Sequence, residues 1–314
     1  MLLIATDEAG YGPKLGPLVI AATVWKVPDR LNHDSLRAAF APLGQPIKVG
    51  DTVVTVNDSK AIYQPSSGLG GLHAAVSASL AWCGMDAGDL EATLGGLCPD
   101  DLQAIRQIPW LEMEKNVAML SADEVAPLLG HWRSSEAELI DVRARIITAQ
   151  EFNESCSNGL NKADLLSQTT LNLVRDTWQR HSAGQTQTEV YCDRHGGRRY
   201  YAGVLQHVIP DAWVNVESET ARESVYCLTL DSHRLRVHFT VKGDSFTPVA
   251  LASMHAKYLR ERMMESLNRY FASRIGDSLK PTAGYPVDAD RFLSEITAAI
   301  EREQIDRSSL IRSR

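Results

Sequence analysis

Short apolar runs in this chain alternate with longer segments in which apolar residues recur at helical spacing. Residues 2–5 are continuously apolar, as in a strand buried on both faces, and a second apolar run spans residues 18–25. Between them, two glycines flank Tyr11 and prolines occupy positions 13 and 17. Such residues favour a tight loop. The chain is therefore predicted to begin with a strand, a loop and a second strand.

The same patterns predict the elements that follow. Further strands are expected over residues 53–56, 142–147, 190–192 and 213–216, and a hairpin over 225–230 and 235–241. Helices are expected over residues 66–82, 160–181, 200–208, 248–275 and 287–303. Strands that alternate with helices and include one antiparallel hairpin predict an α/β fold with a mixed sheet flanked by helices.

Two regions depart from this alternation. Glycines and prolines interrupt the periodicity over residues 84–140, which predicts an inserted helical segment with Trp110 and Trp132 as a small core of its own. The basic tail, residues 307–314, is expected to be loose. We expect one domain over 1–314, with 246–314 as its C-terminal helical part.

Composition limits the class of protein. The 314 residues are 44% hydrophobic and 23% charged, which is typical of a soluble globular protein. No apolar run approaches a membrane span and no basic segment precedes the first strand, so we expect neither a membrane helix nor a signal peptide, and a cytoplasmic location. Five cysteines without a C-x-x-C pair argue against a zinc site or a disulfide framework. The net charge of −7 does not decide whether the chain binds nucleic acid, because local patches and bound ions matter more.

Acidic residues follow three of the predicted strands. Asp7 and Glu8 follow the first strand, Asp193 follows residues 190–192, and Asp244 follows the second arm of the hairpin. Clustered carboxylates repel one another unless they share hard cations such as Mg²⁺. Two such ions about 3.5–4 Å apart activate a water and stabilise the leaving oxygen of a phosphodiester. The acids therefore predict metal-assisted phosphoryl transfer.

Simpler interpretations exist for each of these acids. Polar residues are common at strand ends, and Asp193 could pair on the surface with Arg194 or Arg198. Gly10-x-Gly12 could begin a dinucleotide-binding fingerprint, but the third glycine is missing and prolines replace the expected helix. The co-occurrence of three acid-bearing strand ends favours the metal site.

The stretch Asp7-Glu8-Ala9-Gly10-x-Gly12-x-x-x-Gly16-Pro17 resembles the opening signature of type 2 ribonuclease H, RNase HII. Other motifs of that family follow in the same order along the chain. They are Asn57-Asp58-Ser59-Lys60, Asn161, Asp193, Lys242-Gly243-Asp244-Ser245 with Ala252-Ser253-x-x-Ala256-Lys257, and Gly284-Tyr285-Pro286.

The resemblance implies an RNase H-like mixed sheet with a C-terminal helical extension. It also implies a metal-dependent endonuclease that hydrolyses the RNA strand of RNA/DNA hybrids to 5′-phosphate and 3′-hydroxyl ends. Its catalytic and metal-binding residues would be Asp7, Glu8, Asp193 and Asp244, with Mg²⁺ or Mn²⁺ in a two-ion site. The substrate-binding residues implied are Gly10, Tyr11, Gly12, Ser59, Lys60, Asn161, Lys257 and Tyr285.

Two features differ from the family pattern. Gly10-Tyr11-Gly12 replaces Gly-Arg-Gly. A phenol therefore occupies the position of a guanidinium that could form two hydrogen bonds to a phosphate. The resemblance for this reason leaves recognition of RNA–DNA junctions undecided. Residues 84–140 and 217–235 have no obvious counterpart and could recruit a partner or reshape the substrate groove. Two rival hypotheses remain: a related nuclease acting on DNA or structured nucleic acid, and a non-catalytic nucleic-acid-binding protein on the same fold.

Overall fold

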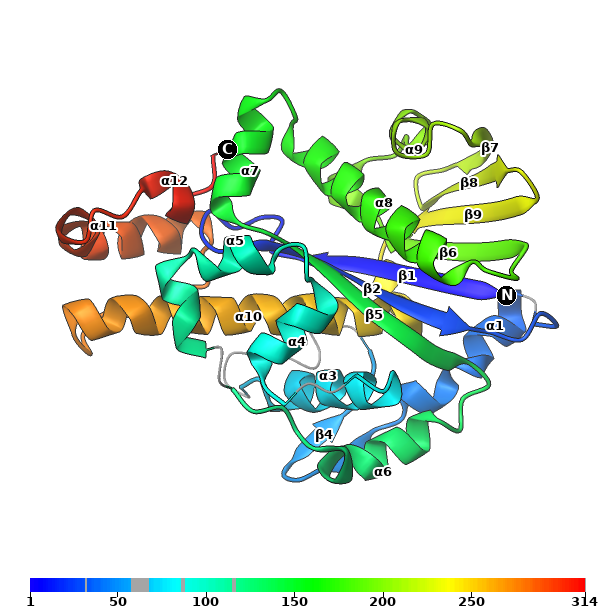
Figure 1. Cartoon of the computed structure of the whole chain (residues 1–314), viewed down its shortest axis with the longest axis horizontal. Coiled ribbons are helices and arrows are strands. Elements are labelled where there is room, and N and C mark those ends of the chain that lie inside the picture. The colour runs from blue at the N-terminus through cyan, green and yellow to red at the C-terminus, as the bar shows by residue number, and fades with distance from the viewer. Residues whose placement is uncertain (32, 58–67, 86–87, 115–116, 314) are drawn as a thin grey trace.

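A seven-stranded mixed sheet forms the centre of the molecule (Figure 1). The computed structural model describes residues 1–31, 33–57, 68–85, 88–114 and 117–313. The strand order is β5-β2-β1-β6-β9-β8-β7. The strands are β1 (Leu2–Ala9), β2 (Leu18–Lys26), β5 (Glu138–Ile147), β6 (Gln187–Asp193), β7 (Trp213–Glu219), β8 (Glu223–Leu230) and β9 (His233–Thr240).

Strand direction brings three chain segments to one edge of the sheet. β1 runs parallel to β6, and β6 runs parallel to β9, whereas β2 is antiparallel to β1. The carboxyl ends of parallel neighbours lie at the same edge of a sheet. The end of β1, the end of β6 and the turn after β9 therefore meet there. The predicted mixed sheet and its hairpin, β8 with β9, are confirmed.

The alternation of side chains along β1 explains why helices cover both faces of the sheet. Leu3 and Ala5 belong to one buried cluster, and Leu2 and Ile4 to another on the opposite face. The first face is covered by α3 (Gly70–Trp82), α6 (Ala122–Trp132) and α10 (Thr247–Ile275), and the second by α8 (Lys162–His181) and α9 (Ala202–Val208) (Figure 1).

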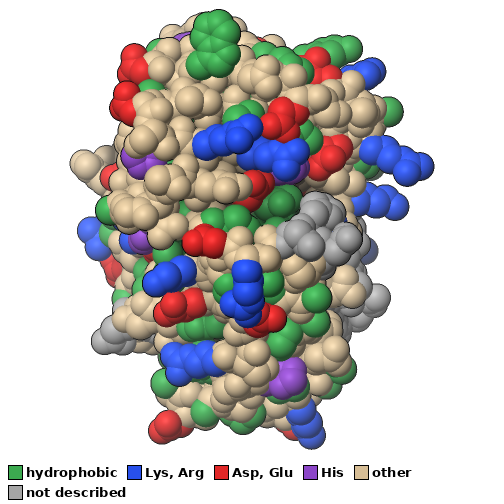
Figure 2. Space-filling view, turned by 90° about the vertical axis from the view of Figure 1, so that its right-hand side faces the viewer, with side chains coloured by type: hydrophobic (Ala, Val, Ile, Leu, Met, Phe, Trp, Pro, Cys, Tyr) green, Lys and Arg blue, Asp and Glu red, His purple; other side chains and the backbone are tan. Residues whose placement is uncertain are grey.

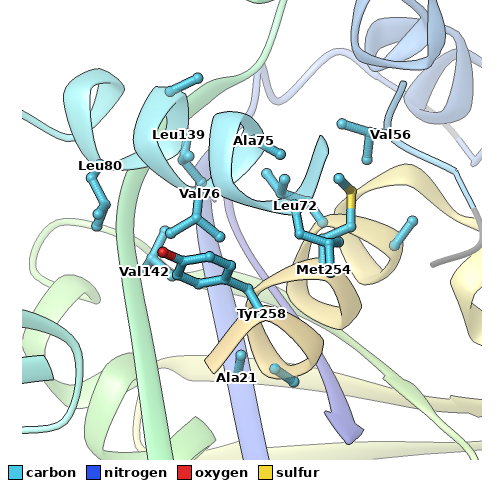
Figure 3. Close-up of a cluster of buried hydrophobic side chains, with 14 of the residues drawn as sticks. Ala21, Val56, Leu72, Ala75, Val76, Leu80, Leu139, Val142, Met254 and Tyr258 are labelled. Atoms are coloured by element: carbon cyan, nitrogen blue, oxygen red, sulfur yellow. The ribbon is translucent and has the colours of Figure 1, made fainter. Parts of the chain in front are cut away.

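Helices α3 and α10 pack together on the first face (Figure 3). Leu72 and Val76 of α3 lie near Met254 and Tyr258 of α10, above Ala21 of β2. The Tyr258 hydroxyl is 2.7 Å from His73 Nδ1 of α3, so the polar end of this buried ring has a partner. This packing fixes α10, whose first turns lie beside the acids.

A third cluster extends beyond the sheet. The second half of α10 packs against α11 (Pro286–Arg302) and Trp110, with α12 (Arg307–Leu310) beside them. Trp132 belongs instead to the first cluster, near Trp82. The expected separate core of Trp110 and Trp132 is therefore wrong: the two rings belong to different clusters, each shared with other parts of the chain.

The remaining elements are short. They are α1 (His33–Ala39), η1 (Ala41–Gly44), β3 (Ile47–Val49), β4 (Thr52–Val54), α4 (Leu90–Leu97), α5 (Leu102–Arg106), η2 (Pro109–Glu114), α7 (Ala149–Ser157), η3 (His195–Gly197) and η4 (Gly243–Ser245). Residues 84–140 do contain helices, but the boundaries of an insertion stay a prediction. Among the described residues, no helix has the length and apolar content needed to cross a membrane.

The C-terminal tail is ordered against the first loop, contrary to the expectation that it is loose. Ile311 forms a bridge with Leu15, and the Arg312 amide donates to the carbonyl of Lys14. The guanidinium of Arg312 also donates to the Pro13 carbonyl and is buried. Long-range backbone pairing of this kind leaves no local signal in a basic sequence. The tail therefore holds the loop that carries Gly10, Tyr11 and Gly12.

Candidate active site

Asp7 and Glu8 lie inside β1 and not after its end. β1 continues to Ala9 because these residues pair with β2, Asp7 opposite Ala21 and Glu8 opposite Ile20. The pairing of β1 with β6 stops at Thr6. The two acids therefore occupy the part of β1 that has lost its neighbour on the β6 side, which leaves a notch in the sheet.

The other two acids border this notch. Asp193 is the last residue of β6, and its Oδ1 accepts a hydrogen bond of 2.7 Å from the Gly243 amide. Lys242 turns the chain after β9 with a left-handed φ of 58°, and Asp244 follows in η4. This turn folds the chain back against the end of β6, where Gly243 packs on Asp193, and it brings Asp244 close enough to act on Asp7.

The carboxylates act on one another. Asp7 is 8% exposed, and its pKa is raised to about 8 by burial first and then by the negative charges of Asp193 and Asp244. Hydrogen bonds from Ser253 and from the Glu8 amide, 2.8 Å from Asp7 Oδ1, oppose that rise in pKa only in part. The pKa of Glu8 is raised well above its usual value by burial, Asp7 and Asp193. The structure thus brings the four predicted acids to one place.

The set of donor atoms suits a hard divalent cation. Carboxylate oxygens are the ligands that Mg²⁺ and Mn²⁺ prefer, and a bound cation would offset the repulsion that raises these pKa values. As placed, no three His, Cys, Asp or Glu side chains of the described residues are arranged to hold a metal ion. The assignment of the acids as metal ligands stays a prediction.

The turn after β1 packs closely on α10. Gly10 has a φ of 89°, and a Cβ there would lie 2.5 Å from the Pro17 carbonyl oxygen and 2.6 Å from Arg260 Nε. Arg260 is buried, pairs with Glu261 and donates to the Ala283 carbonyl. Only glycine fits this contact without strain.

Gly10→Ala is therefore expected to destabilise the fold by about 2–4 kcal/mol, because it adds a strained φ and a clash with backbone. Gly12→Ala is the matched control, since its Cβ would make an ordinary contact of 3.6 Å with the Tyr285 ring. Urea unfolding of both variants measures the difference. Equal stability of the two would show that the turn is not packed as described.

Tyr11 spans the notch between β1 and β6. A Cβ at Gly196 would lie 2.6 Å from the Tyr11 hydroxyl, so this ring reaches the turn that follows Asp193. The Lys162 amine lies 4.3 Å from the centre of the ring. Burial, and then the charge of Glu8, raise the pKa of the Tyr11 hydroxyl, which keeps it a hydrogen-bond donor at neutral pH.

The other predicted substrate-binding residues differ in position. Tyr285, 56% exposed, lies next to Gly12 at the start of α11. Lys257 on α10 forms an ion pair of 2.8 Å with Glu261. Asn161 caps α8 by accepting from the amides of Ala163 and Asp164, which gives it a structural role at least. Ser59 and Lys60 lie outside the described residues.

Three residues beside the site carried no role in the sequence interpretation: Lys162, Arg260 and Ser253. Each reaches the site through tertiary contact, with Tyr11, Gly10 and Asp7 respectively. Lys162 follows Asn161, and Ser253 lies within the Ala-Ser-x-x-Ala-Lys motif. Their closeness to a motif in the sequence is the signal that could have identified them as residues of the site. No such signal marked Arg260.

No known family model matches the chain, and no curated protein sequence does. Three solved structures that match are type 2 ribonucleases H. RNase HII of Archaeoglobus fulgidus, from its complex with PCNA, has 16% identity and a TM-score of 0.45, over 100% of this chain and 95% of that one. Ribonuclease H2 of Pyrococcus horikoshii OT3 has 14% identity and a TM-score of 0.41, over 99% and 92%. Bst-RNase HIII in complex with Mn²⁺ has 15% identity and a TM-score of 0.40, over 99% and 66%.

The mixed sheet flanked by helices that the sequence predicts is confirmed by the chain's own structure, in which seven strands carry helices on both faces.

Proposed function

We propose that this protein is a metal-dependent endonuclease that hydrolyses the RNA strand of RNA/DNA hybrids, leaving 5′-phosphate and 3′-hydroxyl ends. The observation that carries the proposal is the notch where Asp193 and Asp244 raise the pKa of Asp7, and where Asp7 and Asp193 raise the pKa of Glu8. A fold gains no stability from mutually repelling, part-buried carboxylates. Their retention at one edge of the sheet fits a site that works with cations bound.

Asp7, Asp193 and Asp244 would hold Mg²⁺ or Mn²⁺, and Glu8 would orient water or the substrate near a 2′-hydroxyl. When bound, such ions supply an activated water and stabilise the leaving oxygen of the phosphodiester. The Ser253 hydrogen bond and the Glu8 amide keep Asp7 oriented toward the notch.

Selection of RNA would come from the turn beside the acids. A hybrid differs from a DNA duplex in the 2′-hydroxyls that line its minor groove. The tight packing of Gly10 on Pro17 and Arg260 fixes the turn that carries Tyr11, and the Tyr11 hydroxyl can donate a hydrogen bond to a bound strand. Lys162, held against the Tyr11 ring, adds positive charge for a phosphate.

A panel of end-labelled substrates tests the proposal. With Mg²⁺ we expect cleavage of an RNA/DNA hybrid at least 100-fold faster than cleavage of duplex DNA or single-stranded RNA, and none in EDTA. Cleavage of a DNA duplex that contains one ribonucleotide tests whether the site, with Tyr11 in the turn, recognises an RNA–DNA junction. Cleavage of duplex DNA at the same rate as hybrid would favour the DNA nuclease, and binding of hybrid without cleavage of any substrate would favour the non-catalytic protein.

A further inference from the structure

Four cations and an exposed tyrosine gather at the same sheet edge as the acids. Arg194 directly follows Asp193, and Lys242 lies two residues before Asp244. Arg199 and Tyr200 lie before α9, and Arg222 lies in the turn between β7 and β8. We call Arg194, Arg199, Tyr200, Arg222 and Lys242 the basic platform.

Hydrogen bonds to backbone tie the platform's three segments together. The guanidinium of Arg194 donates to the Ala221 carbonyl at 2.7 Å, and that of Arg199 donates to the Glu219 carbonyl at 2.6 Å. The Val241 amide donates to the Arg222 carbonyl at 2.9 Å, which joins this turn to the end of β9. The guanidiniums of Arg194 and Arg199 are therefore held by neutral acceptors, and the turn that carries Arg222 is positioned through its backbone.

The platform keeps its positive charge. In the part of the chain that the structure describes, no ion pair links Arg194, Arg199, Arg222 or Lys242 to a carboxylate. The nearby glutamates have other partners: Glu219 accepts from the Tyr226 hydroxyl and Glu223 lies 3.2 Å from His238 Nδ1. Figure 2 shows Lys and Arg side chains interspersed with Asp and Glu side chains on the face of the molecule nearest β7, β8 and β9, and some of the cations project into solvent. A local excess of unpaired cations on a chain with net charge −7 indicates an anionic partner.

Tyr200 gives the platform an aromatic surface. Its side chain is 63% exposed, and the Arg199 guanidinium lies 5.5 Å from the centre of its ring. Exposed aromatic rings interleaved with Arg and Lys are the combination that contacts nucleic acid, with the cations on phosphates and the ring on a sugar or base.

We propose that the basic platform binds the nucleic-acid backbone next to the cleavage site, with phosphates on Arg199, Arg222 and Lys242 and a sugar or base on Tyr200. This proposal rests on the proposed function, which supplies the identity of the nucleic acid as an RNA/DNA hybrid. The turn between β7 and β8 belongs to the region for which the sequence showed no counterpart in type 2 ribonucleases H. This region would lengthen the substrate surface beyond the acids.

Binding of a labelled 24-base-pair hybrid, followed by fluorescence anisotropy in EDTA, tests the platform separately from cleavage. The triple variant R199Q/R222Q/K242Q is expected to raise Kd about 10-fold or more at 100 mM KCl, and to reduce the slope of log Kd against log salt by about 2–3. The matched control is R30Q/R106Q/R302Q, which removes three exposed arginines that each pair with a glutamate. Its Kd should change less than about 2-fold.

Two further variants separate the loss of contacts with nucleic acid from a loss of folding. R222Q/K242Q leaves the Arg199 contact with Glu219 intact and should reduce the salt slope by about 2, because two phosphate contacts are lost. Tyr200→Ala should weaken binding several-fold with an unchanged slope, since stacking is not a charge effect. Unchanged thermal unfolding establishes that each variant is folded.

The outcomes separate this proposal from the proposed function. If the platform and control triple variants weaken binding equally, or if neither changes Kd or slope, the platform proposal is overturned even where the wild type cleaves hybrid. If binding depends on the platform but the wild type cleaves no hybrid with Mg²⁺ or Mn²⁺, the platform stands and the nuclease proposal fails.

Discussion

Replacing Asp7 with Asn is expected to lower the rate of hybrid cleavage by about 1,000-fold or more while the protein remains folded. Asn has nearly the shape of Asp and can still accept from the Glu8 amide, but it contributes no charge to a metal ion. Asp7 interacts with Asp193, Asp244 and Ser253, so its loss alters the centre of the site. Single-turnover cleavage at saturating hybrid measures the effect.

Asp176→Asn supplies the matched control. This residue lies on α8, 56% of its side chain is exposed, and it pairs with Arg175, so the same chemical change occurs away from the acids. Its cleavage rate should stay within about 2-fold of wild type. Equal rates for Asp7→Asn and wild type would rule out a catalytic role for Asp7.

The metal-free protein is expected to lose stability as the pH rises from about 4 to about 8, through Asp7. The pKa of Asp7 is about 8 in the fold against its usual 3.8, because burial and the neighbouring acids disfavour its charged form. In this window the folded chain therefore binds more protons than the unfolded chain. Stability falls by up to about 1.4 kcal/mol per pH unit, and the contribution is fully lost above pH 8.

Comparison with Asp7→Asn isolates this effect from other titrating groups, such as the buried His195. In EDTA the variant should match wild type near pH 4 and melt about 5–10 °C higher near pH 8.5. Mg²⁺ should then raise the melting temperature of wild type more than that of the variant. Calorimetric melting across this pH range provides the measurement. A constant difference between the two proteins would contradict the raised pKa.

Much of the sheet could be predicted because its strands carry strong local signals. The run at residues 2–5 marks β1, but its continuation through Asp7 to Ala9 depends on pairing with β2, which local hydrophobicity does not encode. The prediction therefore ended the strand too early and still placed the acids at the correct edge. The short elements α1 and β3 lack a long periodic pattern and were missed for that reason.

The acids of the site could be predicted from the sequence, whereas most of the contacts that surround them could not. Asp7, Asp193 and Asp244 each come after a recognisable apolar or alternating run, so the parallel order of β1, β6 and β9 suffices to bring them together. Arg260 reaches Gly10 from α10, and Arg312 reaches Pro13 from the end of the chain. Such contacts join residues that are hundreds of positions apart in the chain, and the sequence around each residue does not indicate them.

Diffraction from crystals soaked in Mn²⁺ tests the central claim most directly, because the anomalous signal locates the ion without reference to activity. We expect a peak about 2.0–2.2 Å from a carboxylate oxygen of Asp7 and from one of Asp193 or Asp244. The peak should be absent in Asp7→Asn crystals soaked in the same way. Ordered Mn²⁺ at other sites only, with Asp7 free of metal at saturating concentration, would contradict the claim that these acids form a metal-dependent active site.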